Sequence, residues 1–130
     1  MGTAELRYEI SNGARRSRNL MDPLQGVIYG NIFLKQEVTL TGPIDGATEY
    51  QYVELAGVDL VAEGNTSQPF TTGELPAGDY TFLGFFDVDG NGAQTKDPDS
   101  GDPVTLPNNQ FRIVAGQKVS ATISFDLIFN

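Results

Sequence analysis

The sequence predicts an all-β domain, an antiparallel Greek-key β-sandwich of about seven short strands. Three observations indicate this fold class. Short runs rich in Val, Ile, Phe, Tyr and Thr recur along the chain, and most of its 15 Gly and 7 Pro residues lie between or beside them. Long windows with apolar residues at helical spacing are missing. The C-terminal run alternates between apolar and polar residues at all but one position, which is typical of a strand with one buried face.

Eight segments are expected to form strands, and Pro69–Thr72 is expected to lie at a sheet edge. In chain order they are Val27–Leu34, Glu37–Thr41, Tyr50–Leu55, Val58–Val61, Pro69–Thr72, Tyr80–Asp87, Phe111–Val114 and Val119–Phe129. Gly42-Pro43 reads as a turn, because Gly and Pro are the strongest turn residues. In the last segment the apolar positions are Val119, Ala121, Ile123, Phe125, Leu127 and Phe129, and Ile128 alone interrupts the alternation.

The chain is expected to contain one sandwich, residues 25–130, preceded by an N-terminal arm, residues 1–24. The arm includes one candidate strand, Leu6–Ile10, in which apolar and charged residues alternate. Arg15, Arg16 and Arg18 could form a patch for a polyanion, but three arginines in a polar stretch are more often a solvated surface. We therefore expect a solvated arm.

Composition excludes several classes of function. The chain has no cysteine and no histidine, so disulfides, the commonest general base and the commonest zinc ligand are absent. The formal charge is −9, and residues 36–130 carry 14 acidic against 3 basic residues. Such a body suits cations and repels nucleic acid and anionic lipid. The sequence has no apolar run long enough to span a membrane, although a lipid anchor in a full-length precursor stays open.

The segment Leu75-Pro76-Ala77-Gly78-Asp79-Tyr80 places a Pro-Gly turn just before a strand that begins with Tyr. This spacing predicts a tyrosine corner, in which the Tyr hydroxyl donates a hydrogen bond to the backbone of the preceding turn. The longer stretch LPAGDYTFLGFFDVDGNG resembles the prealbumin-like (carboxypeptidase-regulatory-like) modules of bacterial secreted proteins and lipoproteins. The resemblance implies a prealbumin-like or immunoglobulin-like sandwich and an extracytoplasmic, secreted or cell-surface bacterial location. The acidic insertion after Phe86 departs from the plain module.

That insertion carries the clearest chemical signal of the sequence. The hexapeptide Asp87–Gly92 (DVDGNG) matches the opening of a calcium loop, D-x-[DN]-x-[DN]-G. Alternate residues of a curled loop direct oxygen ligands to one centre, and Ca²⁺ takes six to eight of them. Asp87, Asp89 and Asn91 would supply side-chain oxygens, and Ala93 would supply a carbonyl. We therefore expect calcium as the cofactor, bound by the loop 87–102.

The loop then departs from an EF-hand. Its twelfth position is Pro98, where a bidentate Glu should stand, and the preceding element is a strand. Asp97, Asp99 and Asp102 are the candidates for the missing carboxylate, with Asp97 nearest in sequence. The alternative is a solvated acidic hairpin with Asn-Gly turn chemistry. We expect weak binding of the extracellular class and a structural role, because no helix pair is present to switch.

An enzyme is the least supported class, because no nucleophile, phosphate-loop or dinucleotide motif occurs. Glu54 and Asp126 could serve as a carboxylate pair, but the polar face of a strand explains them more simply. The expected function is a non-enzymatic scaffold or interaction module with a structural calcium site. The alternative is a carbohydrate-binding module, with Tyr50 and Tyr52 stacking on a glycan. The sequence does not identify a protein or glycan partner.

Overall fold

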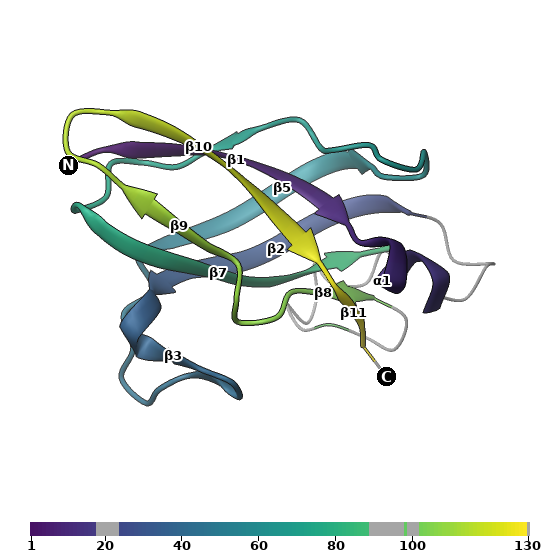
Figure 1. The fold of residues 1–130 in the computed structure, drawn as a ribbon, viewed down its shortest axis with the longest axis horizontal. Coiled ribbons are helices and arrows are strands. Elements are labelled where there is room, and N and C mark those ends of the chain that lie inside the picture. Colours follow the sequence, from purple (N-terminus) through teal and green to yellow (C-terminus); the bar gives the residue numbers. More distant parts are fainter. Residues whose placement is uncertain (18–23, 89–97, 99–101, 130) are drawn as a thin grey trace.

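Two β-sheets pack face to face, with an apolar layer between them (Figure 1). The computed structural model describes residues 1–17, 24–88, 98 and 102–129. The predicted all-β sandwich is confirmed, but the described residues form eleven strands rather than about seven. Five of the eleven contain only two residues, which is too short to give a periodic signal in the sequence.

The smaller sheet has the strand order β10 (Lys118–Phe125), β1 (Thr3–Ile10) and β6 (Phe70–Thr71). The larger sheet has the order β11 (Leu127–Ile128), β8 (Pro103–Val104), β7 (Gly78–Asp87), β2 (Gln25–Leu34) and β5 (Gln51–Asp59), and β9 (Gln110–Ile113) also pairs with β7. A separate hairpin joins β3 (Val38–Thr39) and β4 (Gly42–Pro43). Two short helices, α1 (Asn12–Ser17) and the 3₁₀ turn η1 (Lys35–Glu37), complete the described elements.

Strand β1 lies in the middle of the smaller sheet and is an integral part of the sandwich. Its alternate residues Ala4, Leu6, Tyr8 and Ile10 are all buried in the core. It pairs in parallel with β10 along its whole length, an exception to the expected antiparallel arrangement. Residues 1–10 therefore belong to the sandwich itself, although the sequence alone suggests an arm.

The segment after β1 is also anchored. The guanidinium of Arg15, on α1, donates hydrogen bonds to the carbonyl oxygens of Leu60 and Val61 at 2.9 Å and of Ala62 at 3.4 Å. These bonds attach α1 to the segment that follows β5. The geometry gives Arg15 a structural role, in place of either a polyanion patch or a freely solvated side chain.

Aromatic side chains from both sheets fill the core. Tyr8 lies edge-on to Phe82 with ring centroids 5.1 Å apart, and stacks on Phe125 at 5.9 Å. Phe86 stacks on Phe125 from the larger sheet at 5.9 Å. Gly84 leaves room for this packing, because a Cβ there would lie 2.6 Å from the Phe82 ring and 2.2 Å from the carbonyl oxygen of Tyr29.

The predicted tyrosine corner is confirmed. The Tyr80 hydroxyl donates a hydrogen bond of 2.7 Å to the carbonyl oxygen of Pro76, and the side chain is fully buried. Burial, with a smaller effect from Tyr50, raises the pKa of Tyr80 above its ordinary value, so the hydroxyl keeps its proton and remains a donor.

Several strand boundaries differ from the expected ones. The predicted strands Tyr50–Leu55 and Val58–Val61 are one strand, β5, because the chain continues through an irregularity at Gly57, which has φ +70°. Of the predicted strand Glu37–Thr41, only Val38–Thr39 is a strand, β3; Glu37 is the last residue of η1, and Leu40-Thr41 forms the turn before β4. Gly42-Pro43 is not the turn but strand β4, which pairs with β3.

The C-terminal segment Val119–Phe129 is two strands, not one. β10 ends at Phe125, and the chain passes to the larger sheet as β11, where the alternation changes phase: Ile128 is buried, whereas Leu127 and Phe129 are exposed. Near this crossing the side chain of Asn109 accepts a hydrogen bond from the Ser124 N–H at 2.9 Å and donates one to its carbonyl at 3.0 Å. Asn109 thus pairs with the outer edge of β10 as a neighbouring strand would.

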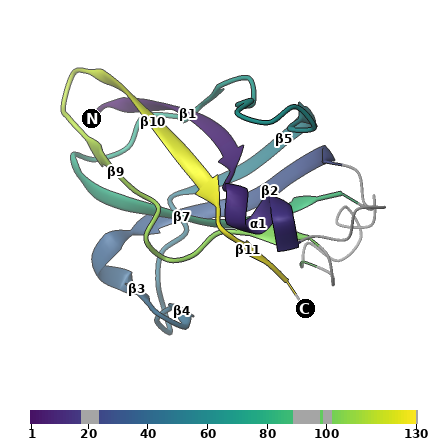
Figure 2. The same ribbon diagram turned by 45° about the vertical axis from the view of Figure 1, so that its right-hand side comes forward.

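The β3–β4 hairpin lies on the outer side of the larger sheet, on the opposite side from the smaller sheet (Figures 1 and 2). The C-terminal strand β11 forms one edge of the larger sheet, beside β8. In the parts of the chain that the structure describes, no helix has the length and apolar character that crossing a bilayer requires.

Candidate metal centre

The predicted calcium loop begins at the end of strand β7. Asp87 is the last residue of this strand, opposite Val27 of β2, and it is only 3% exposed. Along β7, Phe82 and Phe86 face the core between the sheets. Because side chains alternate along a strand, Asp87 shares the outer face of the larger sheet with Phe85.

The loop ends at Asp102, directly before strand β8, and this side chain is 0% exposed. Its Oδ1 atom accepts a hydrogen bond from the backbone N–H of Val88 at 3.3 Å. Its backbone carbonyl accepts one from the N–H of Phe129 at 2.9 Å. Asp102 therefore joins three elements: the end of β7, the start of β8 and the C-terminal segment.

The two acidic residues at the ends of the loop come close together in space. Phe85 pairs with Val104 in the antiparallel β7–β8 ladder, so two residues further along both strands Asp87 lies opposite Asp102. Cβ atoms of directly opposite residues are about 4.5–5.5 Å apart. Like charges on neighbouring side chains repel, and a cation or hydrogen-bond donors offset that repulsion. This buried position therefore favours a cation or donor groups beside the pair.

Five of the predicted ligands lie outside the described residues: Asp89, Asn91, Ala93, Asp97 and Asp99. The structure consequently brings together two of the seven predicted ligands, Asp87 and Asp102. Within residues 1–17, 24–88, 98 and 102–129, no group of three His, Cys, Asp or Glu side chains is arranged to hold a metal ion.

The two tyrosines predicted to form a glycan platform have different environments. Tyr50 packs against the core, edge-on to Tyr80 with ring centroids 5.4 Å apart. Tyr52 is 45% exposed, and its hydroxyl donates a hydrogen bond to the Glu54 carboxylate at 2.9 Å. The pair therefore does not form one flat aromatic surface.

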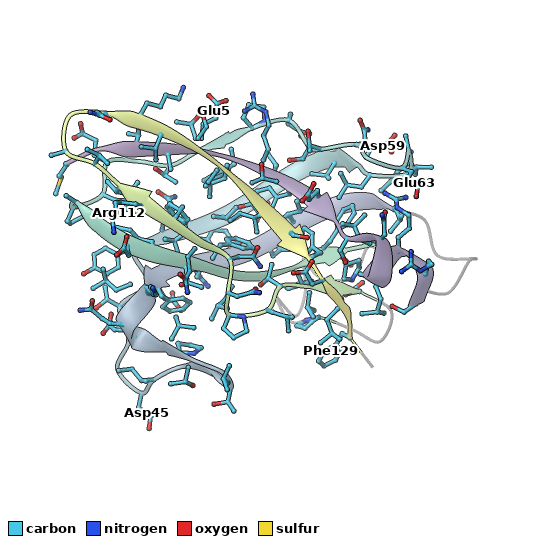
Figure 3. The ribbon with its side chains drawn as sticks, in the orientation of Figure 1. Glu5, Asp45, Asp59, Glu63, Arg112 and Phe129 are labelled. Atoms are coloured by element: carbon cyan, nitrogen blue, oxygen red, sulfur yellow. The ribbon has the colours of Figure 1, made fainter. Side chains whose placement is uncertain are left out.

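A cleft that the sequence reasoning missed lies beside the two carboxylates. Its floor contains Leu83 and Phe85 of β7. Pro43 of the hairpin, Val104 of β8, Pro98 and Phe129 complete its lining, around a volume of about 610 Å³. Figure 3 shows the hairpin, marked by Asp45, and Phe129 on the same outer side of the larger sheet. Ligand sites commonly have volumes of roughly 300–1,000 Å³.

A signal for this cleft is present in the sequence. Strands exposed to water on one face alternate, whereas strands covered on both faces read as continuous apolar runs. β10 alternates, but β2 contains VIYGNIFL and β7 contains TFLGFF. The larger sheet is correspondingly apolar on its outer face too, where Tyr29, Phe33 and Phe85 are buried.

No family model, no curated protein and no solved structure matches this chain. The resemblance to prealbumin-like modules therefore rests on the stretch LPAGDYTFLGFFDVDGNG alone.

Proposed function

We propose that this chain is a non-enzymatic, extracytoplasmic β-sandwich module in which loop 87–102 binds a structural calcium ion. The module would serve a scaffold or interaction role. The observation that supports the calcium site most directly is the position of Asp87 and Asp102, buried opposite each other where β7 ends and β8 begins.

The chemistry of this pair suits a hard divalent cation. A buried carboxylate is costly unless hydrogen bonds or a positive charge compensate it. The Val88 N–H supplies one hydrogen bond to Asp102. A calcium ion would draw further oxygens from the sequence-predicted ligands Asp89, Asn91 and Ala93 and from Asp97 or Asp99, and its attraction for each carboxylate would outweigh the repulsion between the two.

The ion would act as a staple between β7 and β8. Among the described residues the β7–β8 ladder pairs Phe85 with Val104, and the Val88 N–H donates a hydrogen bond to Asp102, so a shared ion would strengthen a short junction at the base of the loop. Calcium at about 100 times its dissociation constant would add roughly 2.7 kcal/mol to the free energy of unfolding. We expect weak affinity, of the order of 10⁻⁴–10⁻³ M, which is typical of extracellular modules.

Calorimetric titration and thermal unfolding test the calcium site. Binding heat should appear with calcium, and the melting temperature should rise by about 10 °C between chelator and saturating calcium, given the entropy of unfolding of a chain of this size. Asp102→Asn and Asp89→Asn should both remove the rise. Asp45→Asn, at an exposed position in the turn after β4, is the charge-matched control and should keep it.

Circular dichroism shows whether the buried Asp102→Asn variant folds, and Asp89→Asn provides the second test if it does not. Absence of binding heat, together with equal melting temperatures in calcium and chelator, would exclude the site. Glycan binding was expected to use Tyr50 and Tyr52 together. Only Tyr52 of this pair has an exposed ring, so we do not propose glycan binding.

A further inference from the structure

Strand β10 forms one edge of the smaller sheet (Figure 2). Its backbone groups alternate in direction. The carbonyl of Phe125 accepts a hydrogen bond from Ser11, which follows β1, whereas the N–H and the carbonyl of Ser124 bond outward to Asn109. Because successive residues of a strand direct their backbone groups to opposite sides, every second residue of β10 faces outward as Ser124 does. Among the described residues, no strand pairs on this side with the other outward residues, which are Lys118, Ser120 and Thr122.

This edge lacks most of the features by which natural sheets block further pairing. β10 contains no proline and no glycine, and its register with β1 is unbroken from Lys118 to Phe125. Lys118, at its start, is the one charged residue in the sequence of the strand. Asn109 covers the other end, at Ser124. The edge is therefore open to another strand over Lys118–Thr122.

The inward side chains beside the open edge are not completely covered. Ile123 and Phe125 of β10 are 0% exposed, whereas Val119 and Ala121 pack against the core but are only partly buried. A further strand beside Lys118–Thr122 would cover both of these side chains. Apolar surface would then leave water, which favours association.

The smaller sheet is electrically balanced, although the chain carries a formal charge of −9. Its acidic residues are Glu5 and Glu9, and its basic residues are Arg7 and Lys118. The Glu5 carboxylate forms ion pairs with both basic residues, at 2.7 Å with Arg7 and at 3.1 Å with Lys118. A second acidic chain therefore meets less repulsion at this sheet than elsewhere on the acidic body.

We propose that two copies of this chain associate through antiparallel pairing of β10 with β10, across a two-fold axis at Ser120. Because Asn109 already bonds to Ser124, the pairing centres on the open residues. Ser120 then lies opposite Ser120 of the second copy, and Lys118 lies opposite Thr122 of the second copy. Each outward backbone group meets an equivalent group of the other chain, and the two smaller sheets become one continuous sheet.

This register also matches side chains between the copies. Lys118 lies diagonally across from Ser124 of the second copy, whose hydroxyl donates a hydrogen bond of 2.6 Å to the carboxylate of Asp126. Diagonal neighbours are about 7–8 Å apart, within reach of a lysine side chain. On the inward face Val119 lies opposite Ala121 of the second copy. The two-fold axis repeats both contacts, so a second copy fits this edge better than an unrelated strand. The association goes beyond the calcium site and does not depend on it.

Analytical ultracentrifugation of the full chain tests the association, in calcium and in chelator. Pairing of two edges makes a small interface, so we expect a reversible dimer whose fraction rises between about 10 μM and 1 mM, equally in both buffers. Ser120→Pro removes an outward N–H, which an edge strand tolerates. It should weaken dimerisation at least about tenfold, because the axis repeats the lost hydrogen bond in both copies.

Ser120→Lys is the second variant, and it decides the test if circular dichroism shows that Ser120→Pro does not fold. It places two like charges opposite each other on the axis and should also weaken the dimer at least about tenfold. Thr41→Lys is the matched control. Thr41 is exposed between β3 and β4, on the far side of the larger sheet (Figure 1), and the substitution adds the same charge. The control should dimerise as the unsubstituted chain does.

Oxidative cross-linking tests the symmetry of the pairing. The chain has no cysteine, so Ser120→Cys supplies one thiol in each copy. Directly opposite, hydrogen-bonded residues have Cα atoms about 5.5 Å apart, which is within the range that a disulfide spans. Mild oxidation should therefore give a covalent dimer at least about tenfold faster than for Thr41→Cys, because the axis raises the effective concentration of the thiols.

Four results would overturn the proposal. They are a chain that stays monomeric up to about 1 mM, a dimer that Ser120→Lys does not weaken, a dimer that requires calcium, and oxidation of Ser120→Cys that is no faster than that of Thr41→Cys. The second would assign the contact to another surface, and the third would assign it to loop 87–102. The expected dimer without calcium binding would refute the calcium site alone, and calcium binding by a monomer would refute the β10 pairing alone.

Discussion

Two buried tyrosines offer a direct test of how this sandwich is held together. Tyr8 and Tyr80 are both completely buried, and both contact core aromatic rings. They differ in the hydroxyl group. Tyr80 donates a hydrogen bond to the Pro76 carbonyl at 2.7 Å, whereas the Tyr8 hydroxyl has no hydrogen-bonding partner among the residues that the structure describes. Substitution of each by Phe removes one oxygen atom and leaves the ring in place.

The two substitutions should have opposite or clearly unequal effects. Tyr80→Phe removes the hydrogen bond and leaves the Pro76 carbonyl without it, which costs about 1–3 kcal/mol. For a chain of this size that loss corresponds to a decrease of roughly 4–11 °C in melting temperature. Tyr8→Phe removes a buried hydroxyl that forms no hydrogen bond with the described residues of the folded chain. The free energy of unfolding should therefore stay equal or rise by up to about 1–3 kcal/mol.

Urea denaturation followed by circular dichroism measures both free energies of unfolding, and equal m-values would show that both variants unfold from the same compact state. Burial raises the pKa of Tyr8 far above its ordinary value, so neither hydroxyl ionises in the assay at neutral pH. A loss for Tyr8→Phe as large as that for Tyr80→Phe would refute the reasoning, because ring packing and not the hydrogen bond would then explain both costs.

Three further predictions follow from single contacts. Asn109→Ala should destabilise the fold by about 1–3 kcal/mol, because the outer edge of β10 loses both of its hydrogen bonds to this side chain. Denaturant titration measures the change in the free energy of unfolding, and an unchanged midpoint would contradict the prediction. Gly84→Ala should lower the free energy of unfolding by about 1–3 kcal/mol or more through overpacking. Gly13→Ala should be neutral or stabilising in the same assay, because Gly13 lies on a helix and the nearest atom to its new Cβ is 4.0 Å away. The Arg112 guanidinium lowers the pKa of Asp79 below its ordinary value, so their ion pair stabilises the folded state above the unfolded pKa of about 3.9, and this stabilisation is lost as the pH falls through the lower folded pKa. The small difference in melting temperature between the unsubstituted chain and Arg112→Gln should therefore vanish in acid. A difference in melting temperature that does not depend on pH would argue against the ion pair.

Local patterns in the sequence were sufficient to predict the fold class and several of its parts. The alternation of Val119–Phe125 identified a strand with one polar face, and Pro76, Gly78 and Tyr80 identified the tyrosine corner that Tyr80 forms. These features depend on residues close in the chain, whose spacing alone determines strand periodicity and turn geometry. The DVDGNG match likewise depends on residues close in the chain. It remains a prediction, because most of its residues lie outside the described ranges.

Other features depend on residues that are distant in the chain, and local patterns do not specify them. The alternation in Leu6–Ile10 indicates a buried face, but only the parallel pairing with β10 places β1 in the middle of a sheet. Leu127 and Phe129 continue the apolar pattern of β10, yet passage of the chain to the other sheet turns them outward.

The candidate site divides in the same way. The sequence by itself determined that an acidic loop follows a core strand and that the body of the chain is negatively charged. Only the tertiary structure decided that Asp87 lies opposite Asp102, and that an apolar cleft opens beside them between the hairpin and Phe129. The physical reason is that cross-strand register and sheet-face burial arise from contacts between segments far apart in the chain, and these contacts leave only weak traces in local residue patterns.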